Sequence, residues 1–212
     1  MHFTALAFAA GTAGLALPTH AQGARAGKPL ILVVGDSLSA EYGLKRGSGW
    51  VALMSQRLAR QWPQARVVNA SISGDTTSGG RSRLPALLQQ HRPTHVVIEL
   101  GANDALRGLP LAMTENNLKA MVQASQAAGA HALLIGMQVP PNYGGPYTRD
   151  FAGLFPKVAK AEKTALVPFL LAGVADDPDA LRWFQADRIH PNEAAQPIML
   201  INVWPALVKL IP

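Results

Sequence analysis

Asp187 and His190 stand three positions apart near the carboxyl end of the chain, and they are the first pair that could carry chemistry. Within one turn, this spacing can bring the carboxylate to one imidazole nitrogen and so fix the tautomer. The other imidazole nitrogen is then left to act as a base. Such a base acts on a hydroxyl group, and Ser37 offers one.

Ser37 comes shortly after a run of apolar residues, 30–34, that ends at Gly35. The run predicts a fully buried strand, and the glycine with the short polar residues after it predicts an abrupt end. In open parallel sheets ligands bind at the carboxyl ends of the strands, so a serine there is well placed as a nucleophile. Alternatively, Asp36 or Ser37 only caps the next helix. No Glu or Gln follows either residue by three positions to form a capping box, but the run alone leaves both interpretations open.

Two further polar stretches follow predicted strands. Residues 69–77 form a loop in which Gly74 lets the backbone approach a ligand closely and present its N–H. Residues 101–104 include Asn103, whose amide supplies two donors on a loop. Each stretch has a structural alternative, because glycine is ordinary in such turns and asparagine there often bonds its own backbone.

Strand and helix patterns alternate along the rest of the chain. The predicted strands cover residues 30–35, 66–70, 95–100, 132–137 and 165–167. The predicted helices cover residues 50–61, 82–90, 114–128, 151–163 and 192–208, with Thr114 as the N-cap of the third. This alternation requires right-handed crossovers and a parallel sheet covered on both faces. We therefore predict a single α/β domain, a three-layer α/β/α fold of the flavodoxin-like kind.

Composition narrows the function classes. The 212 residues are 49% hydrophobic and 15% charged, which is typical of a globular protein with one sizeable core. There are no cysteines, so disulfides and thiolate metal sites are excluded. The net charge is +6, but the basic residues are scattered, so we expect no nucleic-acid partner. The other five histidines lack a metal-ligand spacing such as H-E-x-x-H, and we expect no metal and no cofactor.

Residues 1–21 have the layout of a secretory signal. The chain is apolar or small from residue 3 to residue 17, a run too short to span a bilayer, and Ala21 offers a small residue for cleavage, with Ala24 as the alternative. We therefore expect residues 22–212 to form a single exported domain, periplasmic or secreted. We also expect this domain to be a monomer without stable insertion in a membrane.

Taken together, the polar stretches resemble those of the GDSL esterases in their SGNH subgroup, which is named for Ser, Gly, Asn and His residues in four blocks. Residues 35–39 are Gly-Asp-Ser-Leu-Ser and match the first block, and Gly74 with its neighbours matches the second. Residues 101–104 match the third block, and residues 187–190 match the last. One block alone is a weak signal, whereas four in this order at predicted strand ends are specific.

More narrowly, the chain resembles exported members of this family that act as thioesterases, arylesterases and lysophospholipases. The stretches that carry this likeness are residues 68–75, 140–144 and 162–169. Two residues depart from the family's pattern. Ala102 replaces a frequent second glycine, and Pro110 follows Leu109 in a loop that is expected to move.

The resemblance implies hydrolysis of acyl esters through an acyl-enzyme. In this mechanism Ser37 attacks the carbonyl carbon, His190 takes the serine proton and returns it to the leaving group, and Asp187 orients His190. The N–H groups of Ser37 and Gly74, together with the side-chain amide of Asn103, would hold the oxyanion. The implied partner is a small-molecule ester or thioester.

Substrate choice is expected to depend on apolar residues near the nucleophile. Four residues are candidates for lining an acyl groove: Leu106, Leu109, Pro110 and Tyr143. Without the family, packing within the loops is the simpler interpretation of these residues. Two alternative functions stay open: a carbohydrate O-acetyl esterase, which applies the same chemistry to a polar substrate, and a non-catalytic exported binding protein. The complete Ser37, Asp187 and His190 set argues against the second.

Overall fold

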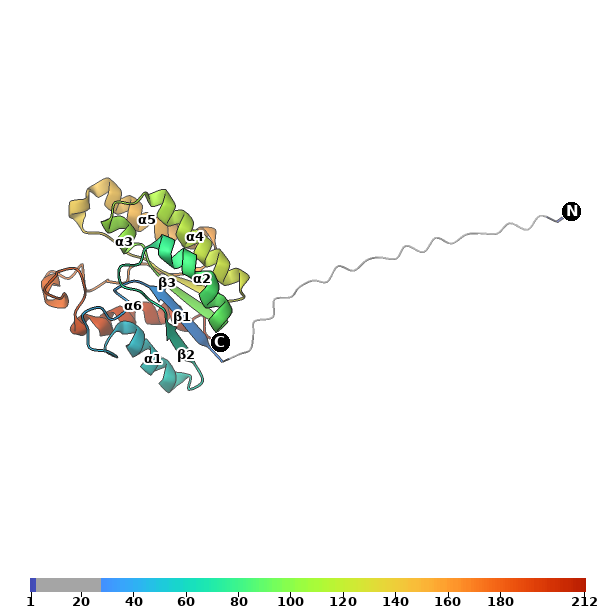
Figure 1. Cartoon of the computed structure of the whole chain (residues 1–212), viewed down its shortest axis with the longest axis horizontal. Helices are drawn as coiled ribbons and strands as arrows, with labels where there is room; N and C mark the ends of the chain where they lie inside the picture. Colours follow the sequence, from blue (N-terminus) through green and yellow to red (C-terminus); the bar gives the residue numbers. More distant parts are fainter. Residues whose placement is uncertain (3–27) are drawn as a thin grey trace.

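Five parallel strands form the sheet at the centre of the molecule. The computed structural model describes residues 1–2 and 28–212, so nearly all of the predicted signal sequence, 1–21, lies outside the described residues. The strands are β1 (Leu30–Gly35), β2 (Arg66–Asn69), β3 (His95–Glu99), β4 (His131–Ile135) and β5 (Ala165–Val167). Their order in the sheet is β2-β1-β3-β4-β5, with parallel pairing throughout (Figure 1). This order is that of flavodoxin-like folds, and it confirms the predicted fold class.

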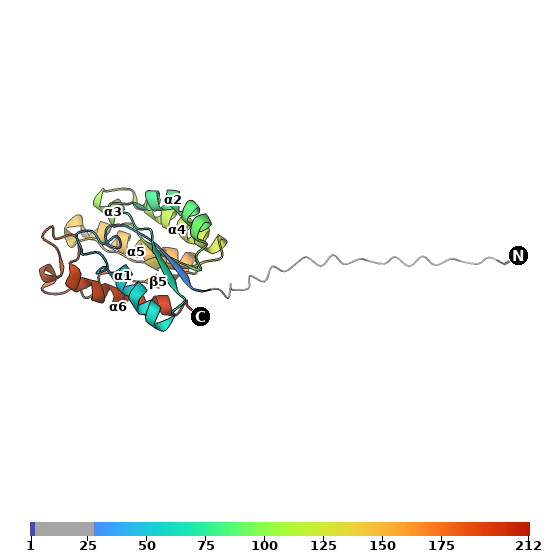
Figure 2. The same cartoon turned by 60° about the horizontal axis from the view of Figure 1, so that its bottom comes forward.

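Helices cover both faces of this sheet. The α-helices are α1 (Trp50–Gln61), α2 (Thr77–His91), α3 (Ala102–Leu106), α4 (Leu111–Ala127), α5 (Gly145–Ala161) and α6 (Gln196–Val208). Three short 3₁₀ turns complete the described part: η1 (Pro141–Tyr143), η2 (Ala180–Trp183) and η3 (Glu193–Ala195). α1 and α6 pack on one face, and α2, α4 and α5 pack on the other (Figures 1 and 2). Among the described residues, none of the helices has both the length and the apolar character to cross a membrane.

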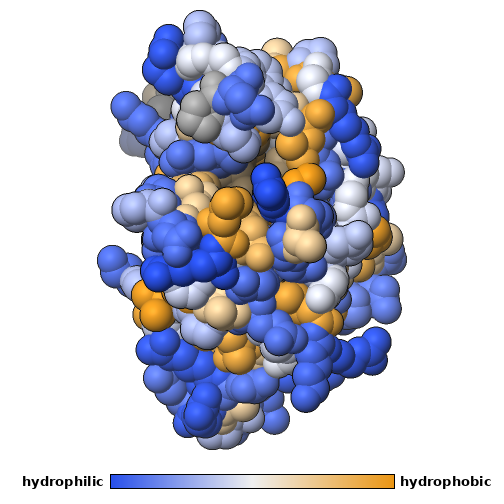
Figure 3. Space-filling model, turned by 90° about the vertical axis from the view of Figure 1, so that its left-hand side faces the viewer, coloured by the Kyte–Doolittle hydropathy of each residue, from blue (hydrophilic) through white to orange (hydrophobic). Residues whose placement is uncertain are grey.

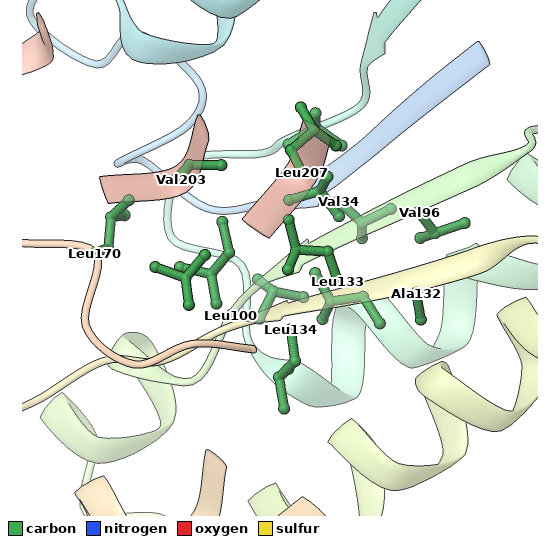
Figure 4. Packing of buried hydrophobic residues seen from close by; sticks show 14 of the residues in the cluster. Val34, Val96, Leu100, Ala132, Leu133, Leu134, Leu170, Val203 and Leu207 are labelled. Carbon is green, nitrogen blue, oxygen red and sulfur yellow. The ribbon is translucent and has the colours of Figure 1, made fainter. Parts of the chain in front are cut away.

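The middle of the sheet is apolar on both faces because both are covered. Residues 31–34 of β1 and 96–98 of β3 have no solvent exposure. Val203 and Leu207 of α6 belong to the same buried hydrophobic cluster as the strand residue Val34 (Figure 4). Burying one side chain of this size contributes about 1.5–3 kcal/mol, so the strands are held firmly. Polar residues that directly follow a strand therefore have well-fixed positions.

α2 begins earlier than the sequence pattern predicts. Its first residue is Thr77 rather than residue 82. The side chain of Thr76 accepts a hydrogen bond from the Gly79 N–H at 3.3 Å, which satisfies one of the unpaired donors at the helix start. Glycine has a low helix propensity, so the glycines in this first turn concealed the helix in the sequence.

α4 also begins earlier than predicted. Its first residue is Leu111, directly after Pro110, so the prediction that Thr114 is its N-cap is wrong. Thr114 lies inside the helix and is fully buried. Its hydroxyl donates to the carboxylate of Asp104 at 3.3 Å, so this threonine has a tertiary partner rather than a capping role.

The last two α-helices differ from the prediction in opposite directions. α5 begins at Gly145, ahead of the predicted residue 151, and carries a proline in its first turn, where no N–H is needed. α6 begins at Gln196 rather than at residue 192, because the 3₁₀ turn η3 precedes it. The sequence therefore predicts which elements exist better than it predicts where they start.

The strand order places two of the predicted site residues next to each other in the sheet. The chain proceeds from β1 to one side and from β3 to the other, so the order reverses between these two strands. In open α/β sheets the crevice for ligands lies at such a reversal, beyond the carboxyl ends of the strands. Ser37 follows β1 and Asn103 follows β3, so they flank this point.

Candidate active site

Ser37 lies in a tight turn that begins where β1 ends. The backbone carbonyl of Asp36 accepts hydrogen bonds from the N–H groups of Ser39 (3.2 Å) and Ala40 (2.9 Å). This turn holds Ser37 partly exposed at the sheet edge. The next helix, α1, starts only at Trp50, so the interpretation that Asp36 or Ser37 merely caps a helix is wrong.

His190 joins Ser37 to Asp187 through the two nitrogens of its ring. Its Nε2 lies 2.9 Å from the Ser37 Oγ, and its Nδ1 lies 2.6 Å from the Asp187 Oδ2. The three side chains form one continuous hydrogen-bonded row. An imidazole that donates from Nδ1 to a carboxylate presents an acceptor at Nε2, which is the state that can take a proton from serine.

A local turn aims Asp187 at the imidazole. Its Oδ1 accepts hydrogen bonds from the N–H groups of Ile189 (2.9 Å) and His190 (3.0 Å), and Arg188 between them has a φ of +58°. The hydrogen bonds from the backbone and side chain of His190, and then from the backbone of Ile189, lower the pKa of Asp187 to about 2. Asp187 is therefore ionised at any pH near neutrality and can hold the Nδ1 proton of His190.

Two residues that the sequence patterns did not indicate hold the His190 loop against the Ser37 turn. The Nε2 of Gln185 donates to the backbone carbonyls of Tyr42 (2.9 Å) and Pro191 (3.1 Å). The ring of Tyr42 lies against the imidazole of His190, with ring centroids 4.3 Å apart. Tyr42 and Gln185 are 143 positions apart in the chain, so no local pattern points to their contact.

Asn103 lies in a helix rather than in the loop that was predicted. α3 begins at Ala102, directly after Gly101, whose φ of +124° is accessible to glycine and rarely to other residues. The Nδ2 of Asn103 donates to the Oδ2 of Asp36 at 2.9 Å, so its amide lies next to the turn that carries Ser37. The amide NH₂ has a second N–H beyond the one used in this contact.

Gly74 lies in the loop after β2 with a φ of +78°, which again favours glycine. Its carbonyl accepts a hydrogen bond from the Nη2 of Arg107 at 2.8 Å, which ties this loop to the end of α3. In the part of the chain that the structure describes, the N–H groups of Gly74 and Ser37 donate to no other group. Both backbone donors are therefore available to a ligand.

Comparison with known proteins agrees with this geometry. The model of the GDSL-like Lipase/Acylhydrolase family matches residues 33–197, which include Ser37, Gly74, Asn103 and His190. The chain belongs to this family. It is a hydrolase that acts on ester bonds.

Individual members of the family are similar over most of the chain. Esterase TesA of Pseudomonas aeruginosa is 54% identical over 181 residues, which are 85% of this chain and 89% of that protein. Thioesterase 1/protease 1/lysophospholipase L1 of Escherichia coli K12 is 44% identical over 170 residues, 80% of this chain and 78% of that protein. A crystal structure of TesA superposes with a TM-score of 0.82 at 54% identity, covering 86% of this chain and 99% of the other.

The third block of this family anchors the site through Asp104 as well as presenting Asn103. Asp104 is fully buried, and its Oδ2 accepts a hydrogen bond from the Thr77 N–H at 2.8 Å. Its Oδ1 accepts from the hydroxyl groups of Thr77 and Thr114. α3 is thereby tied to the starts of α2 and α4. The loop that carries Gly74, directly before α2, is thus held relative to Asn103.

The two departures from the family's pattern both fit the backbone. Ala102 is the first residue of α3, where a helical conformation suits alanine better than glycine. Pro110 directly precedes α4, where the first N–H groups of a helix have no partner within it and a proline removes no hydrogen bond.

A second buried carboxyl group lies beneath the Ser37 turn. Glu99 is the last residue of β3, pairs in register with Gly35 and has no solvent exposure. A Cβ at position 35 would lie 2.9 Å from the Glu99 Oε2 and 2.8 Å from the Ser39 Oγ, so only glycine fits there without a shift. Burial raises the pKa of Glu99 well above its ordinary value, and the nearby Asp36 adds to this. Burial also raises the pKa of Asp36, to about 6.

The four candidate substrate residues all follow β3 and β4, at the same edge of the sheet as Ser37. Leu106, in α3, and Tyr143, in η1, are exposed to solvent. Leu109 is half-buried, and Pro110 is exposed at the start of α4. Their side chains make no hydrogen-bonded contact with the row of Ser37, His190 and Asp187 in the described residues.

Other apolar side chains are exposed at this edge. Ile72, in the loop that carries Gly74, and Ile189, in the loop that carries His190, are both more than half exposed. Figure 3 shows apolar surface between hydrophilic patches on this face of the molecule. The Tyr147 hydroxyl lies 3.5 Å from the backbone carbonyl of Ala105, so the start of α5 contacts α3 here.

Proposed function

We propose that this chain hydrolyses acyl esters and thioesters through an acyl-enzyme intermediate on Ser37. The observation that carries the proposal is the continuous row from the Ser37 Oγ through the imidazole of His190 to the Asp187 carboxylate, with contacts of 2.9 and 2.6 Å. A nucleophile, a base and a group that orients the base are all within hydrogen-bonding distance, as this chemistry requires.

The first half of the reaction acylates the serine. The Ser37 Oγ forms a bond to the carbonyl carbon while its proton passes to the Nε2 of His190. The carbonyl oxygen becomes an oxyanion, held by the N–H groups of Ser37 and Gly74 and by the amide of Asn103. The bond to the leaving group then breaks, and His190 gives its proton to the departing alcohol or thiol.

The second half releases the acid. A water molecule takes the place of the leaving group and gives a proton to His190 as its oxygen bonds to the acyl carbon. The oxyanion forms again against the same donors, and its collapse breaks the bond to the Ser37 Oγ. The serine recovers its proton from His190, and a carboxylic acid leaves. Asp187 keeps the imidazole in its productive tautomer throughout.

The experiment that tests the nucleophile is the variant Ser37→Ala in residues 22–212. Turnover of p-nitrophenyl esters should fall on the order of 10⁴- to 10⁶-fold, because the acyl-enzyme cannot form. Ser82→Ala, which removes an exposed hydroxyl from α2, is the matched control and should keep full activity. An organophosphonate should label Ser37, and labelling of a different residue would refute the assignment.

For the substrate, we propose an acyl chain lying against Leu106, Leu109, Pro110 and Tyr143. Relatives named as an esterase, an arylesterase and a thioesterase with lysophospholipase activity support aryl esters, acyl-CoA and lysophospholipids as classes to test. Burial of one methylene contributes about 0.8 kcal/mol, so Leu109→Ala should lower kcat/KM for medium and long chains by several-fold to tens-fold. Acetyl esters should be nearly unaffected.

The matched control for Leu109→Ala is Ile201→Ala, which truncates an exposed apolar side chain on α6. The series runs from acetyl to palmitoyl p-nitrophenyl esters, and Pro110→Gly is measured beside it because proline restricts the loop. If the wild type, Leu109→Ala and Pro110→Gly had parallel chain-length profiles, this loop would not be part of the acyl site.

We further propose that the working protein is an exported monomer of residues 22–212, in the periplasm or outside the cell, with no nucleic-acid partner and no stable insertion in a membrane. The apolar run from residue 3 to residue 17 and the small residue Ala21 support cleavage after that position. Amino-terminal sequencing of the exported product should begin at Gln22, and light scattering should give the mass of one chain.

A further inference from the structure

The reaction steps leave one pair of buried residues without a role. Asp36 and Glu99 lie beneath the turn that carries Ser37, and their exposed fractions are 1% and 0%. Burying carboxyl groups is unfavourable, because a low-dielectric surrounding penalises the charged form. Two such groups side by side at the edge of the sheet therefore reduce the stability of the fold, which indicates that they serve a function.

The hydrogen bonds of Glu99 favour its protonated form. Its Oε2 accepts from the Ser39 hydroxyl at 2.7 Å and from the Asp36 N–H at 3.4 Å. Its Oε1 is buried and receives no hydrogen bond within the described part of the chain. A neutral carboxyl group solves this, because its O–H donates instead of accepting. The negative charge of the nearby Asp36 also favours a neutral Glu99.

The hydrogen bonds of Asp36 favour its ionised form. Its Oδ1 accepts from the Leu38 N–H at 3.0 Å, and its Oδ2 accepts from the Asn103 Nδ2 at 2.9 Å. A carboxylate can only accept, so Asn103 must turn its NH₂ group, rather than its carbonyl, toward Asp36. The two N–H bonds of a planar amide point in different directions, so fixing one also fixes the other.

We propose that Glu99 and Asp36 are positioning residues for the oxyanion: Glu99 keeps a proton, and the Asp36 carboxylate sets the amide of Asn103 so that its second N–H faces the substrate carbonyl. This inference rests on the role of Asn103 in the proposed function. If Asp36 were the protonated member, its O–H could donate to the amide carbonyl and allow the amide to turn over. A carbonyl facing the oxyanion would then repel the developing charge.

The charges around the pair support this division. Burial, and next to it the charge of Asp36, raise the pKa of Glu99 well above its ordinary value. Burial is also the largest influence on the pKa of Asp36, which stands at about 6 because hydrogen bonds and the nearby His190 oppose it, while Asp75 adds to it. Glu99 therefore keeps its proton at a pH where Asp36 has lost its own.

Infrared spectroscopy tests where the proton lies. At pH 8, the mature enzyme should show the absorption of a neutral carboxyl group, and Glu99→Gln should lack it. Glu115→Gln, which alters a carboxylate paired with Lys157 on the surface, is the matched control and should keep the absorption. A wild-type spectrum without a neutral carboxyl group, or a Glu99→Gln spectrum that retains it, would overturn the proposal.

Kinetics with a p-nitrophenyl ester test whether the pair acts through Asn103. Asp36→Asn leaves one acceptor oxygen where two are needed, so kcat should fall roughly 10- to 100-fold with little change in KM. In an Asn103→Ala background the same substitution should lower kcat less than about threefold, because the group it positions is already gone. Glu99→Leu should also lower kcat, and Glu99→Gln, which keeps an uncharged hydrogen-bond donor at this position, should restore most of the loss.

The outcomes separate this proposal from the function on which it rests. Each kcat is taken per active site titrated with an organophosphonate, so misfolded protein does not enter the value. If Asn103→Ala lowers kcat but Asp36→Asn lowers it equally in both backgrounds, the positioning role is overturned and the mechanism stands. If Asn103→Ala keeps full kcat, the oxyanion role of Asn103 is refuted and the inference falls with it.

Discussion

Asp36 and Asp187 are two aspartates of one site, and the fold gives them opposite surroundings. Asp36 is buried between β1 and α3, and burial raises its pKa to about 6. Asp187 is exposed in a surface turn, and hydrogen bonds from His190 and Ile189 lower its pKa to about 2. The same side chain therefore loses its proton only near pH 6 at one place and already in strong acid at the other.

The difference shows how a fixed half and a loop half are combined in one site. The fixed half, around Ser37 and Asn103, takes its precision from the buried sheet edge and accepts the unfavourable burial of a carboxylate. In the loop half, around His190, local hydrogen bonds keep Asp187 fully ionised, and its charge need not be buried. Gln185 joins the two halves by donating to the carbonyl of Tyr42.

The largest expected effect comes from neutralising Asp187, the exposed one of the two aspartates. Asp187→Asn should lower kcat by roughly 10⁴-fold, because the amide no longer holds the productive tautomer of His190. Its Tm should fall only slightly at neutral pH, since the side chain lies on the surface. Activity within tenfold of the wild type would mean that the loop half does not supply the base.

The pH profile of the wild type sharpens the same comparison. His190 must be neutral to accept the serine proton, so turnover should rise from acid to neutral pH, by about tenfold per unit on its acid limb, and stay high in mild alkali. Asp187, with a pKa of about 2, stays ionised over this whole range and does not cause the acid loss. Steady-state kinetics from pH 4 to 9 check this, and a maximum near pH 4 would contradict a histidine base.

Breaking the link between the halves should have a smaller effect. Gln185→Ala removes the hydrogen bonds to the carbonyls of Tyr42 and Pro191, so the His190 loop loses a contact with the Ser37 turn. We expect kcat to fall roughly tenfold, because the distance between base and nucleophile is then less well fixed. Gln138→Ala, at an exposed position after β4, serves as the control. Equal kcat in the two variants would show that the halves hold their positions independently.

The smallest expected effect is on stability, and its sign differs between the two aspartates. The folded-state pKa of Asp36 is raised, so the stability linked to its proton is present below about pH 4 and is lost as the pH rises through about 6. The pKa of Asp187 is lowered, so its contribution is present above about pH 4 and is lost as the pH falls through about 2.

Thermal unfolding across pH measures this difference. Between about pH 4 and 7, the Tm of Asp36→Asn should rise above that of the wild type, because the variant has no carboxyl group to ionise in the buried site. Each kcal/mol by which the buried charge destabilises the wild type corresponds to about 2–4 °C in Tm. Asp187→Asn should show no such gain over the same interval. Its Tm should lie below that of the wild type there and should approach the wild-type value only in stronger acid, where Asp187 becomes protonated. If the Tm difference from the wild type had the same sign for both variants over this pH range, the surroundings assigned to the two aspartates would be wrong.

Local patterns were enough to predict the sheet and the His190 turn. The apolar run before Gly35 is a strand because burial on both faces demands continuous hydrophobicity, and a spacing of three brings Asp187 to His190 because one turn of chain is that short. Helix starts were harder. Thr114 has the chemistry of a cap, yet it lies inside α4 because Asp104, from another helix, offers it a buried partner.

The rest of the site depends on contacts that the sequence does not encode locally. Glu99 is a visible exception to an apolar strand, but its partner is chosen by the register of β3 with β1, which places it opposite Gly35. Tyr42 and Gln185 carry no signal at all, since an aromatic and an amide residue are ordinary in any loop. Their roles follow from the folded arrangement of two distant segments.

The crowding around Gly35 limits how this enzyme can be engineered. Replacing glycine by alanine is a common route to thermostability, because it reduces the conformational freedom of the unfolded chain. At Gly35 the added methyl group would press on Ser39 and Glu99 at 2.8–2.9 Å, directly under the turn that carries Ser37. At Gly153, on α5, such a methyl group would meet no atom within 4 Å beyond its chain neighbours and the backbone of its own helix, and alanine there gains up to about 1 kcal/mol of helix propensity. Thermostable variants are therefore to be sought among the outer helices, while the glycine at the end of β1 is left untouched.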